Sequence, residues 1–198
     1  MLQRPFSAAC ERNQEDIAKQ LQSLLRDSQC VLEIGSGSGQ HAVWFAPRLP
    51  WLEWHTSDLT KCHNGIMQWL KASPNANLFP PIALDVCKIW PKIGQDAIFS
   101  ANTVHIMPWR AVTKLFLGAA ETLPRNGLLC LYGPVIYTRK ALALSNQAFD
   151  QNLKQRDPTQ GLRYFEALDR LAHRAGLQLT ADTTMPANNQ LLVWQKLG

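Results

Sequence analysis

The fold of this chain is best predicted from one segment, Val31-Leu32-Glu33-Ile34-Gly35-Ser36-Gly37-Ser38-Gly39-Gln40-His41. Apolar residues lead into an acidic residue, and three glycines follow at every second position. This pattern predicts a buried strand that ends near Ile34, a glycine turn, and a helix that begins at Gly39 or Gln40. Glycine tolerates positive φ and has no Cβ to keep a ligand from the backbone. We therefore expect a ligand to bind against the turn.

Three kinds of ligand site have a glycine-rich turn of this type. A P-loop requires Gly-Lys-Ser/Thr after four intervening residues, and the turn lacks that sequence. The dinucleotide fingerprint G-x-G-x-x-G fits the first two glycines, but Gln40 occupies the position of its third glycine. An NAD-binding oxidoreductase therefore remains only the weaker alternative.

The third pattern, E/D-x-G-x-G-x-G, matches Glu33, Gly35, Gly37 and Gly39, and through it the chain resembles class I methyltransferases. A carboxylate at the strand end suits a cationic sulfonium cofactor and would repel a pyrophosphate. The resemblance implies that S-adenosylmethionine is the cofactor and that these four residues belong to its site.

The composition fits a single domain over residues 1–198, because this length and a hydrophobic content of 46% allow one good core. The chain shows neither a secretory core nor a run of roughly 20 apolar residues, so we expect a cytoplasmic protein without a membrane association. Its five cysteines form no C-x-x-C pair, which favours reduced thiols. The net charge of +5 comes from scattered Lys and Arg residues, which argues against a nucleic-acid partner.

Hydrophobic periodicity predicts alternating helices and strands. Helices are expected over residues 14–26 (capped by Asn13), 41–49, 61–72 and 108–123, and in two pieces after residue 141 that are broken at 157–161. Strands are expected over 30–34, 51–56, 78–84 (an edge strand), 96–104, 127–136, 177–184 and 190–196. This order predicts an α/β fold: a Rossmann-like, doubly wound, seven-stranded, mostly parallel sheet with a C-terminal antiparallel β-hairpin and helices on both faces.

Further residues complete the expected cofactor site. Asp58 closes the second strand, 23 residues past Gly35, where a carboxylate accepts hydrogen bonds from ribose hydroxyls, and Leu59 follows it. The resemblance places Asp85 and Val86 beside the adenine, although Asp85 at the N-cap of a helix over 87–93 is an open alternative. It also implies that the arm and helix over 1–28 cover the cofactor. Arg12, Asn13 and Asn102 are further candidates for cofactor contacts.

The segment after the fourth strand is where the resemblance places the methyl acceptor. His105 is a candidate general base because its ordinary pKa lies near working pH, and a histidine that holds a loop is the alternative. Trp109 and Tyr132 are candidates for the walls of the acceptor site, or for ordinary core packing. Arg163 is a candidate for binding an acidic acceptor, with a surface salt bridge as the alternative. The five histidines show no ligand spacing, so the sequence predicts no metal site.

The chain also resembles a narrower group of small uncharacterised proteins of the methyltransferase-like 26 type. The matching segments are 8–13, 31–41, 102–109, 132–134, 149–153, 156–158 and 161–163. Gln160 and Tyr164 depart from the pattern of that group, which puts the details of substrate binding in question. No Asn-Pro-Pro-Tyr-type motif follows the fourth strand, which favours a small-molecule or protein acceptor. The expected function is methyl transfer from S-adenosylmethionine. A non-catalytic module that binds the cofactor and another protein is the alternative, and the oligomeric state stays open.

Overall fold

The computed structural model describes residues 4–198. The helices are α1 (Ala8–Leu24), α2 (Gln40–Phe45), α3 (His63–Ala72), α4 (Trp109–Thr122), α5 (Leu144–Arg156) and α6 (Phe165–Arg174), with short 3-10 turns at Ala46–Arg48, Thr60–Cys62 and Pro186–Asn188. The strands are β1 (Cys30–Ile34), β2 (Glu53–Asp58), β3 (Leu78–Ala83), β4 (Ala97–Ala101), β5 (Leu128–Gly133), β6 (Val135–Ile136), β7 (Arg163–Tyr164), β8 (Leu177–Met185) and β9 (Asn189–Lys196).

Seven strands form one mixed, mostly parallel sheet in the order β3-β2-β1-β4-β5-β9-β8. Strand β1 is parallel to both β2 and β4, whereas β9 is antiparallel to β5 and to β8. The predicted Rossmann-like α/β sheet with a C-terminal antiparallel hairpin is confirmed. By its internal contacts the chain packs as two compact units, residues 1–100 and 101–198, so each is described in turn. A single domain stays a prediction.

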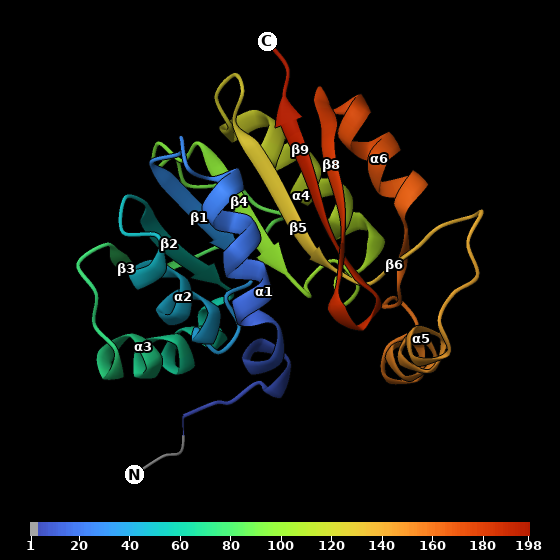
Figure 1. The fold of residues 1–198 in the computed structure, drawn as a ribbon, viewed down its shortest axis with the longest axis horizontal. Coiled ribbons are helices and arrows are strands. Elements are labelled where there is room, and N and C mark those ends of the chain that lie inside the picture. The colour runs from blue at the N-terminus through green and yellow to red at the C-terminus, as the bar shows by residue number, and fades with distance from the viewer. Residues whose placement is uncertain (1–3) are drawn as a thin grey trace. The chain divides into compact units, whose positions relative to one another are not determined.

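The first unit is built on the parallel strands β1, β2 and β3, with α2 and α3 beside them (Figure 1). Its core contains Phe45, Trp54 and Phe99, whose ring centroids lie 5.4 to 5.8 Å from one another. Aromatic contacts of this kind add about 0.5–1.5 kcal/mol per pair to the stabilisation by burial. The aromatic cluster therefore fixes β2, β4 and α2 around β1.

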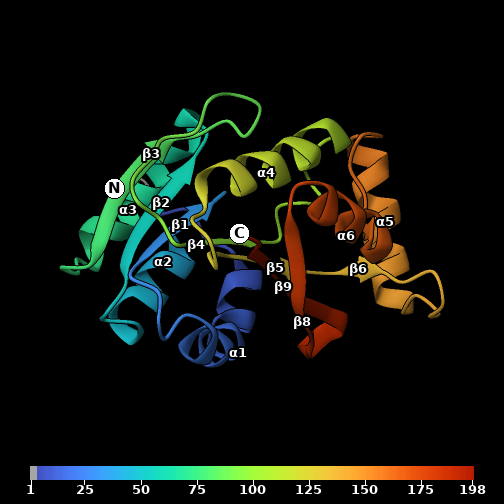
Figure 2. The ribbon, with the colours of Figure 1, turned by 90° about the horizontal axis from the view of Figure 1, so that it is seen from above.

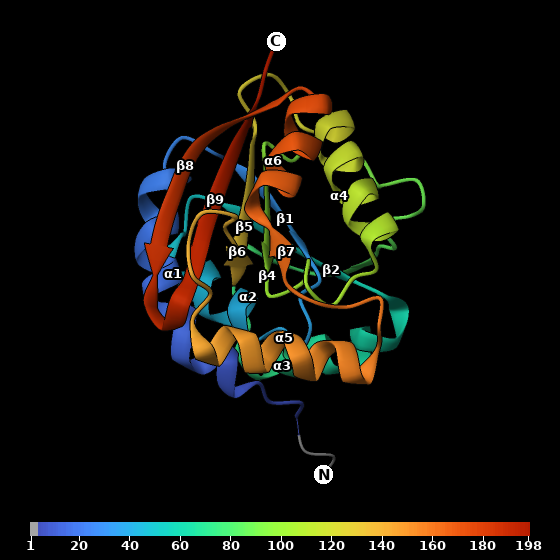
Figure 3. The same cartoon turned by 90° about the vertical axis from the view of Figure 1, so that its right-hand side faces the viewer.

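The second unit is built on the hairpin of β8 and β9, with α6 beside β8. Figures 2 and 3 show α4 and α6 side by side. Phe116 of α4 packs edge-on against Trp194 of β9 at 5.3 Å, and the Trp194 indole donates a hydrogen bond to Asp169 of α6 at 3.0 Å. These contacts join both helices to the last strand.

Two predicted elements, and the helix over 87–93 that was an open alternative, differ from the structure. Helix α1 begins at Ala8 with Ser7 as its N-cap, so the prediction that Asn13 caps a helix from residue 14 is wrong. The predicted strand over 51–56 is shifted, because the Trp51 indole donates to the carbonyl of Leu25 and pairing starts at Glu53. Residues 87–93 contain turns in place of a helix, because Pro91 lacks the N–H that a helix needs.

Two predicted strands are shorter in the structure. Strand β4 ends at Ala101 because Asn102 adopts a positive φ of 56°. The strand expected over 127–136 is divided at Pro134, and β6 pairs with β7 instead of continuing β5. Within residues 4–198, no helix has the length and apolar character needed to cross a membrane.

Candidate functional site

The glycine turn between β1 and α2 has the conformation that its sequence requires. Gly35, Gly37 and Gly39 have φ values of 72°, 59° and 88°. A Cβ on Gly39 would lie 3.1 Å from the Cα of Ile66 in α3, so this glycine allows close packing. A Cβ on Gly37 would meet only the carbonyl oxygen of Gly35, at 4.0 Å. Gly37 is therefore the position where a ligand can approach the backbone.

Asp58 at the end of β2 joins this turn. One carboxylate oxygen accepts a hydrogen bond from the N–H of Gly37 at 2.8 Å, and the other accepts from the N–H of Leu59 at 2.7 Å. An ionised carboxylate has about four acceptor sites, so hydroxyl donors can still bind it. The structure thus brings together two residues that the sequence predicted for one site.

Glu33 lies beneath the turn and is almost fully buried. Its carboxyl group accepts hydrogen bonds from the Ser36 hydroxyl at 2.8 Å and from the Trp54 indole at 3.2 Å. Burial raises the pKa of Glu33 to about 7. The Ser57 hydroxyl donates to the Glu33 carbonyl at 2.6 Å. Glu33 therefore stabilises the turn through its hydrogen bond with Ser36. Its direct contact with a cofactor stays a prediction.

Helix α1 is attached to α2 through Asn13. The Asn13 side-chain oxygen lies 2.7 Å from Nε2 of His41. Because an amide oxygen only accepts, Nε2 of His41 carries the proton. Burial lowers the pKa of His41 to about 4, so its ring is neutral at physiological pH. Asn13 thus fixes the position of α1, whereas the neighbouring Arg12 is exposed.

The segment after β3 lies next to the end of β2. The N–H of Leu84 donates to the carbonyl of Asp58 at 3.0 Å. Asp85 accepts from the N–H of Cys87 at 2.9 Å, which closes a turn, and Val86 is buried. The first unit therefore holds Asp85 near Asp58, but as the stabiliser of a turn and not as a helix cap.

In the second unit, Asn102 and Tyr132 lie together where β4 and β5 end. The Asn102 N–H donates to the Tyr132 carbonyl at 2.8 Å. A Cβ on Gly133 would lie 3.4 Å from the Asn102 side-chain oxygen, so a glycine permits this approach.

His105 is buried in a loop that several later segments surround. Its ring meets the edge of Phe149 at 5.1 Å, and its carbonyl accepts from the N–H of Gly161 at 2.9 Å. Burial, together with the nearby charge of Arg163, lowers the pKa of His105 to about 4. Among the residues that the structure describes, no group hydrogen-bonds its buried Nδ1.

Arg163 holds the same loop. Its guanidinium donates to the carbonyls of Val104 at 3.2 Å, Thr159 at 3.0 Å and Met107. It also lies 5.9 Å from the ring centroid of Trp109, which is partly exposed. The alternative for Arg163 was a surface salt bridge. Its guanidinium instead donates hydrogen bonds to backbone carbonyls.

A family model described as "Protein of unknown function (DUF938)" matches residues 4–196. The chain belongs to the DUF938 family. Two of the segments quoted for the narrower resemblance, 149–153 and 161–163, contribute the Phe149, Gly161 and Arg163 contacts to the His105 loop. In this DUF938 chain, distant parts of the second unit therefore converge on one loop.

Solved structures share the fold of this DUF938 protein. An S-adenosylmethionine-dependent methyltransferase, SibL, in its apo form has a TM-score of 0.81 at 15% identity, covering 96% of this chain and 56% of its own. An O-methyltransferase family protein from Burkholderia thailandensis has a TM-score of 0.76 at 13% identity, covering 93% and 58%. Human N-acetylserotonin methyltransferase in complex with SAM has a TM-score of 0.74 at 14% identity, covering 96% and 58%. The chain therefore spans little more than half the length of these structures, and the likeness concerns the fold.

Some of the contacts that position these residues were not predicted from the sequence. His41 stood at the end of the glycine segment, but nothing in its spacing indicated a bond to Asn13. Trp54 was expected only as part of a strand, and its bond to Glu33 arises because β1 and β2 are neighbours.

Proposed function

We propose that this chain is an S-adenosylmethionine-dependent methyltransferase that holds its cofactor at the turn between β1 and α2. The observation that carries the proposal is the Gly37 N–H bound to Asp58, with open space where a Gly37 side chain would be. The methyltransferase fold of the solved neighbours supports it.

The residues of the first unit fit this cofactor. Asp58 has acceptor sites left for ribose hydroxyls, and the open backbone at Gly37 admits a ligand without a steric clash. Asp85 and Val86 lie next to the end of β2, where they are candidates for contacts with the adenine. When bound, the cofactor supplies an activated methyl group on a sulfonium. The protein then mainly has to orient the acceptor and exclude water.

His105 is better suited to hydrogen bonding than to strong general-base catalysis. With a pKa of about 4 its ring is neutral at physiological pH, and a base this weak removes a proton from an alcohol poorly. Its buried Nδ1 lacks a partner within residues 4–198 and is able to accept a hydrogen bond from an O–H or N–H group. We propose that His105 orients the acceptor, and that Trp109 and Tyr132 contribute to acceptor binding.

We also propose that the chain is of the methyltransferase-like 26 type and that its acceptor is a small molecule or a protein. The support is that Phe149, Gly161 and Arg163, which lie in the segments quoted for the narrower resemblance, all contact the loop of residues 104–107. Arg163 is then a positioning residue for this loop.

Calorimetric titration with S-adenosylmethionine tests the cofactor site. We expect the protein to bind S-adenosylmethionine and Asp58→Ala to weaken binding at least about tenfold, since a charged acceptor of hydrogen bonds is lost. Asp27→Ala is the matched control, because Asp27 is exposed and pairs only with its neighbour Arg26 within the described chain. Unchanged affinity in Asp58→Ala, or preference for NAD in a competition titration, would contradict the proposed site.

Catalysis is tested separately from binding. Purified protein with radiolabelled cofactor is mixed with metabolite and protein extracts, and His105→Ala serves as the comparison. Labelled product that falls in His105→Ala, with unchanged cofactor affinity, is the expected result. Cofactor binding without any labelled product would instead support a non-catalytic cofactor-binding module.

A further inference from the structure

A thiol, a carboxylate and an imidazole lie together at the amino ends of β1 and β2 in the first unit. Cys30 and Glu53 are the first residues of these strands and are register partners. His55 follows Glu53 by two residues, so both side chains project from the same face of β2. Paired residues on neighbouring strands also share a face. The pairing of β1 with β2 therefore gathers three different metal-binding groups.

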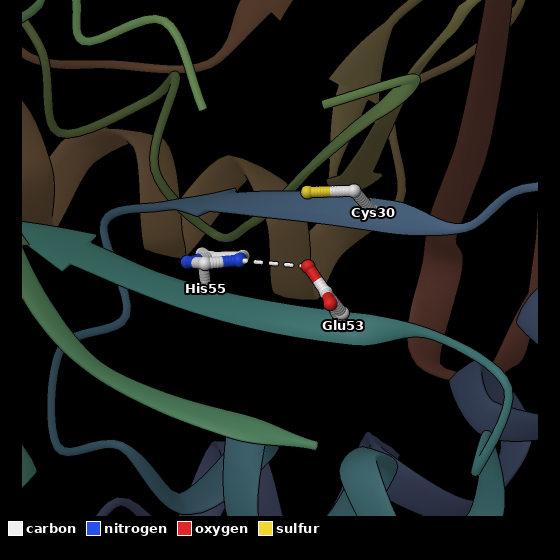
Figure 4. Close-up of side chains that lie close together, drawn as sticks. All are labelled: Cys30, Glu53 and His55. Atoms are coloured by element: carbon white, nitrogen blue, oxygen red, sulfur yellow. Dashed lines mark ion pairs between the residues drawn. The ribbon is translucent and has the colours of Figure 1, made fainter. Parts of the chain in front are cut away.

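The three groups lie at distances that suit a shared metal ion. One ligand atom from each residue lies within 4.8 Å of the other two, and Nε2 of His55 is 3.6 Å from a carboxylate oxygen of Glu53 (Figure 4). Zinc bonds of about 2.0–2.3 Å in a tetrahedral site place ligand atoms roughly 3.3–3.8 Å apart. The imidazole and carboxylate already meet this spacing. The exposed Glu53 side chain is free to turn, and the thiol has to approach by about 1 Å.

The imidazole is held in place and its nitrogen is available. The His55 ring stacks on Phe79 of β3, with centroids 4.2 Å apart and an angle of 9° between the planes. Its Nε2 is buried, and the Glu53 carboxylate oxygen at 3.6 Å is beyond hydrogen-bond distance. A buried nitrogen without a hydrogen bond is uncommon in folded proteins. A metal ion between the two groups would bind both.

A second carboxylate and a cavity adjoin the cluster. Asp96 accepts hydrogen bonds from the N–H groups of Gln29 at 2.8 Å and Cys30 at 3.1 Å, so it fixes the backbone of Cys30. Its negative charge also favours a cation nearby. A cavity of about 600 Å³ has Cys30, Glu53 and Asp96 in its lining. It provides a path for an ion to Cys30 and Glu53.

We propose that Cys30, Glu53 and His55 bind a zinc ion, with water in the fourth position. A thiolate combined with an imidazole suits zinc, whereas magnesium and calcium prefer oxygen ligands alone. On binding, the Cys30 thiol releases its proton to solvent and the sulfur forms a bond to the metal.

This site is separate from the proposed cofactor site. Four residues of β1, 31–34, lie between its first residue, Cys30, and the glycine turn, and the strand rises about 13 Å from Cys30 to Ile34. Zinc would therefore link β1 to β2 and stabilise the first unit, without a part in methyl transfer.

Titration of tag-free protein with zinc sulfate tests the proposal. We expect one ion per chain, and we expect Glu53→Gln and His55→Gln each to weaken zinc binding at least about tenfold. With cobalt as the probe, the intact protein should show a thiolate-to-metal charge-transfer band that Cys30→Ser abolishes. Added zinc should raise the melting temperature of the intact protein and leave that of Glu53→Gln unchanged.

Cys87→Ser and His173→Gln are matched controls, because both side chains are exposed and lie outside the cluster. Glu53→Gln is the decisive variant, since an exposed side chain can be changed without disturbing the core. Circular dichroism shows whether each variant is folded. Zinc affinity that is equal in the intact protein and in Glu53→Gln, or that depends on the control residues, would overturn the proposal. Unchanged binding of S-adenosylmethionine by Glu53→Gln separates this result from the test of the cofactor site.

Discussion

The buried carboxyl group of Glu33, next to the glycine turn, makes the stability of the fold depend on pH. Burial raises its pKa from 4.5 to about 7, although Ser36 and Trp54 donate hydrogen bonds to it. A raised pKa means that the folded state binds the proton more tightly than the unfolded chain. The stability that this proton provides is complete below pH 4.5 and is lost as the pH rises through about 7. The shift corresponds to a free energy on the order of 3 kcal/mol.

Glu33→Gln should remove this dependence on pH. We expect the variant to gain stability relative to the intact protein between about pH 5 and about pH 8, because glutamine does not ionise. The measurement is urea unfolding of both proteins at these two pH values. Glu15→Gln is the control, since its exposed carboxyl lies outside the core. Parallel stability curves for Glu33→Gln and the intact protein would contradict the role of the buried carboxyl.

The turn between β1 and α2 contains one glycine that close packing requires and another that leaves room for a ligand. Gly39→Ala places a Cβ 3.1 Å from the backbone of Ile66, in a residue whose φ is 88°. We expect it to cost about 1–3 kcal/mol of stability. Gly37→Ala meets no close neighbour, so it should cost only about 1 kcal/mol of backbone strain. If Gly37 admits the cofactor, this milder variant should nevertheless lose most of its affinity for S-adenosylmethionine.

The two glycine variants are compared by urea unfolding and by cofactor titration. Each serves as the control for the other, because they lie two residues apart in one turn. A Gly37→Ala protein that binds S-adenosylmethionine as tightly as the intact protein would show that the ligand does not approach this part of the backbone.

The loop that contains His105 depends on β7 through Arg163. Arg163→Lys replaces a planar fork of donors with a single ammonium group, which cannot reach the carbonyls of Val104, Met107 and Thr159 together. We expect amide hydrogen exchange in residues 103–107 to become roughly ten- to a hundredfold faster, which corresponds to the loss of about 1–3 kcal/mol of hydrogen bonding. Mass spectrometry measures this exchange. Arg170→Lys on α6, an exposed position, is the control. Equal exchange in both variants would rule out Arg163 as the residue that holds the loop.

The sequence predicted elements well where one local pattern governed them. The strand Cys30–Ile34 and the start of α2 were predicted correctly, because apolar residues and glycines determine both. The start of α1 was predicted wrongly, with Asn13 as the cap, because residues 8–16 show no apolar periodicity. The structure uses Ser7, and this choice leaves Asn13 free to bond His41.

The contacts between elements were not predictable in the same way. Glu33 matched a sequence motif, but its burial under the turn depends on Trp54 in the neighbouring strand. Likewise, Cys30 and His55 are 25 positions apart, and only the register of β1 with β2 brings them together. A search for ligand spacing along the sequence therefore predicted no metal site.

For the molecule as a whole, two buried histidines contribute to the loss of stability in acid. Burial lowers the pKa of His41 in the first unit and of His105 in the second from 6.5 to about 4, with the charge of Arg163 adding to the shift at His105. A lowered pKa means that the unfolded chain binds the proton first. Each histidine therefore contributes stability that is present above pH 6.5 and is lost as the pH falls through about 4.

Glu33, whose raised pKa acts in the opposite direction over much of the same range, offsets part of this loss. Each of the three shifts corresponds to about 3 kcal/mol, so two losses and one gain predict a net loss on the order of 3 kcal/mol between about pH 7 and about pH 4. Urea unfolding across this range measures the loss. His105→Gln should reduce the measured loss by about 3 kcal/mol, because glutamine does not take up a proton, whereas His173→Gln, at an exposed position, should leave it unchanged. A His105→Gln protein that loses as much stability in acid as the intact protein would show that His105 is not held neutral in the fold.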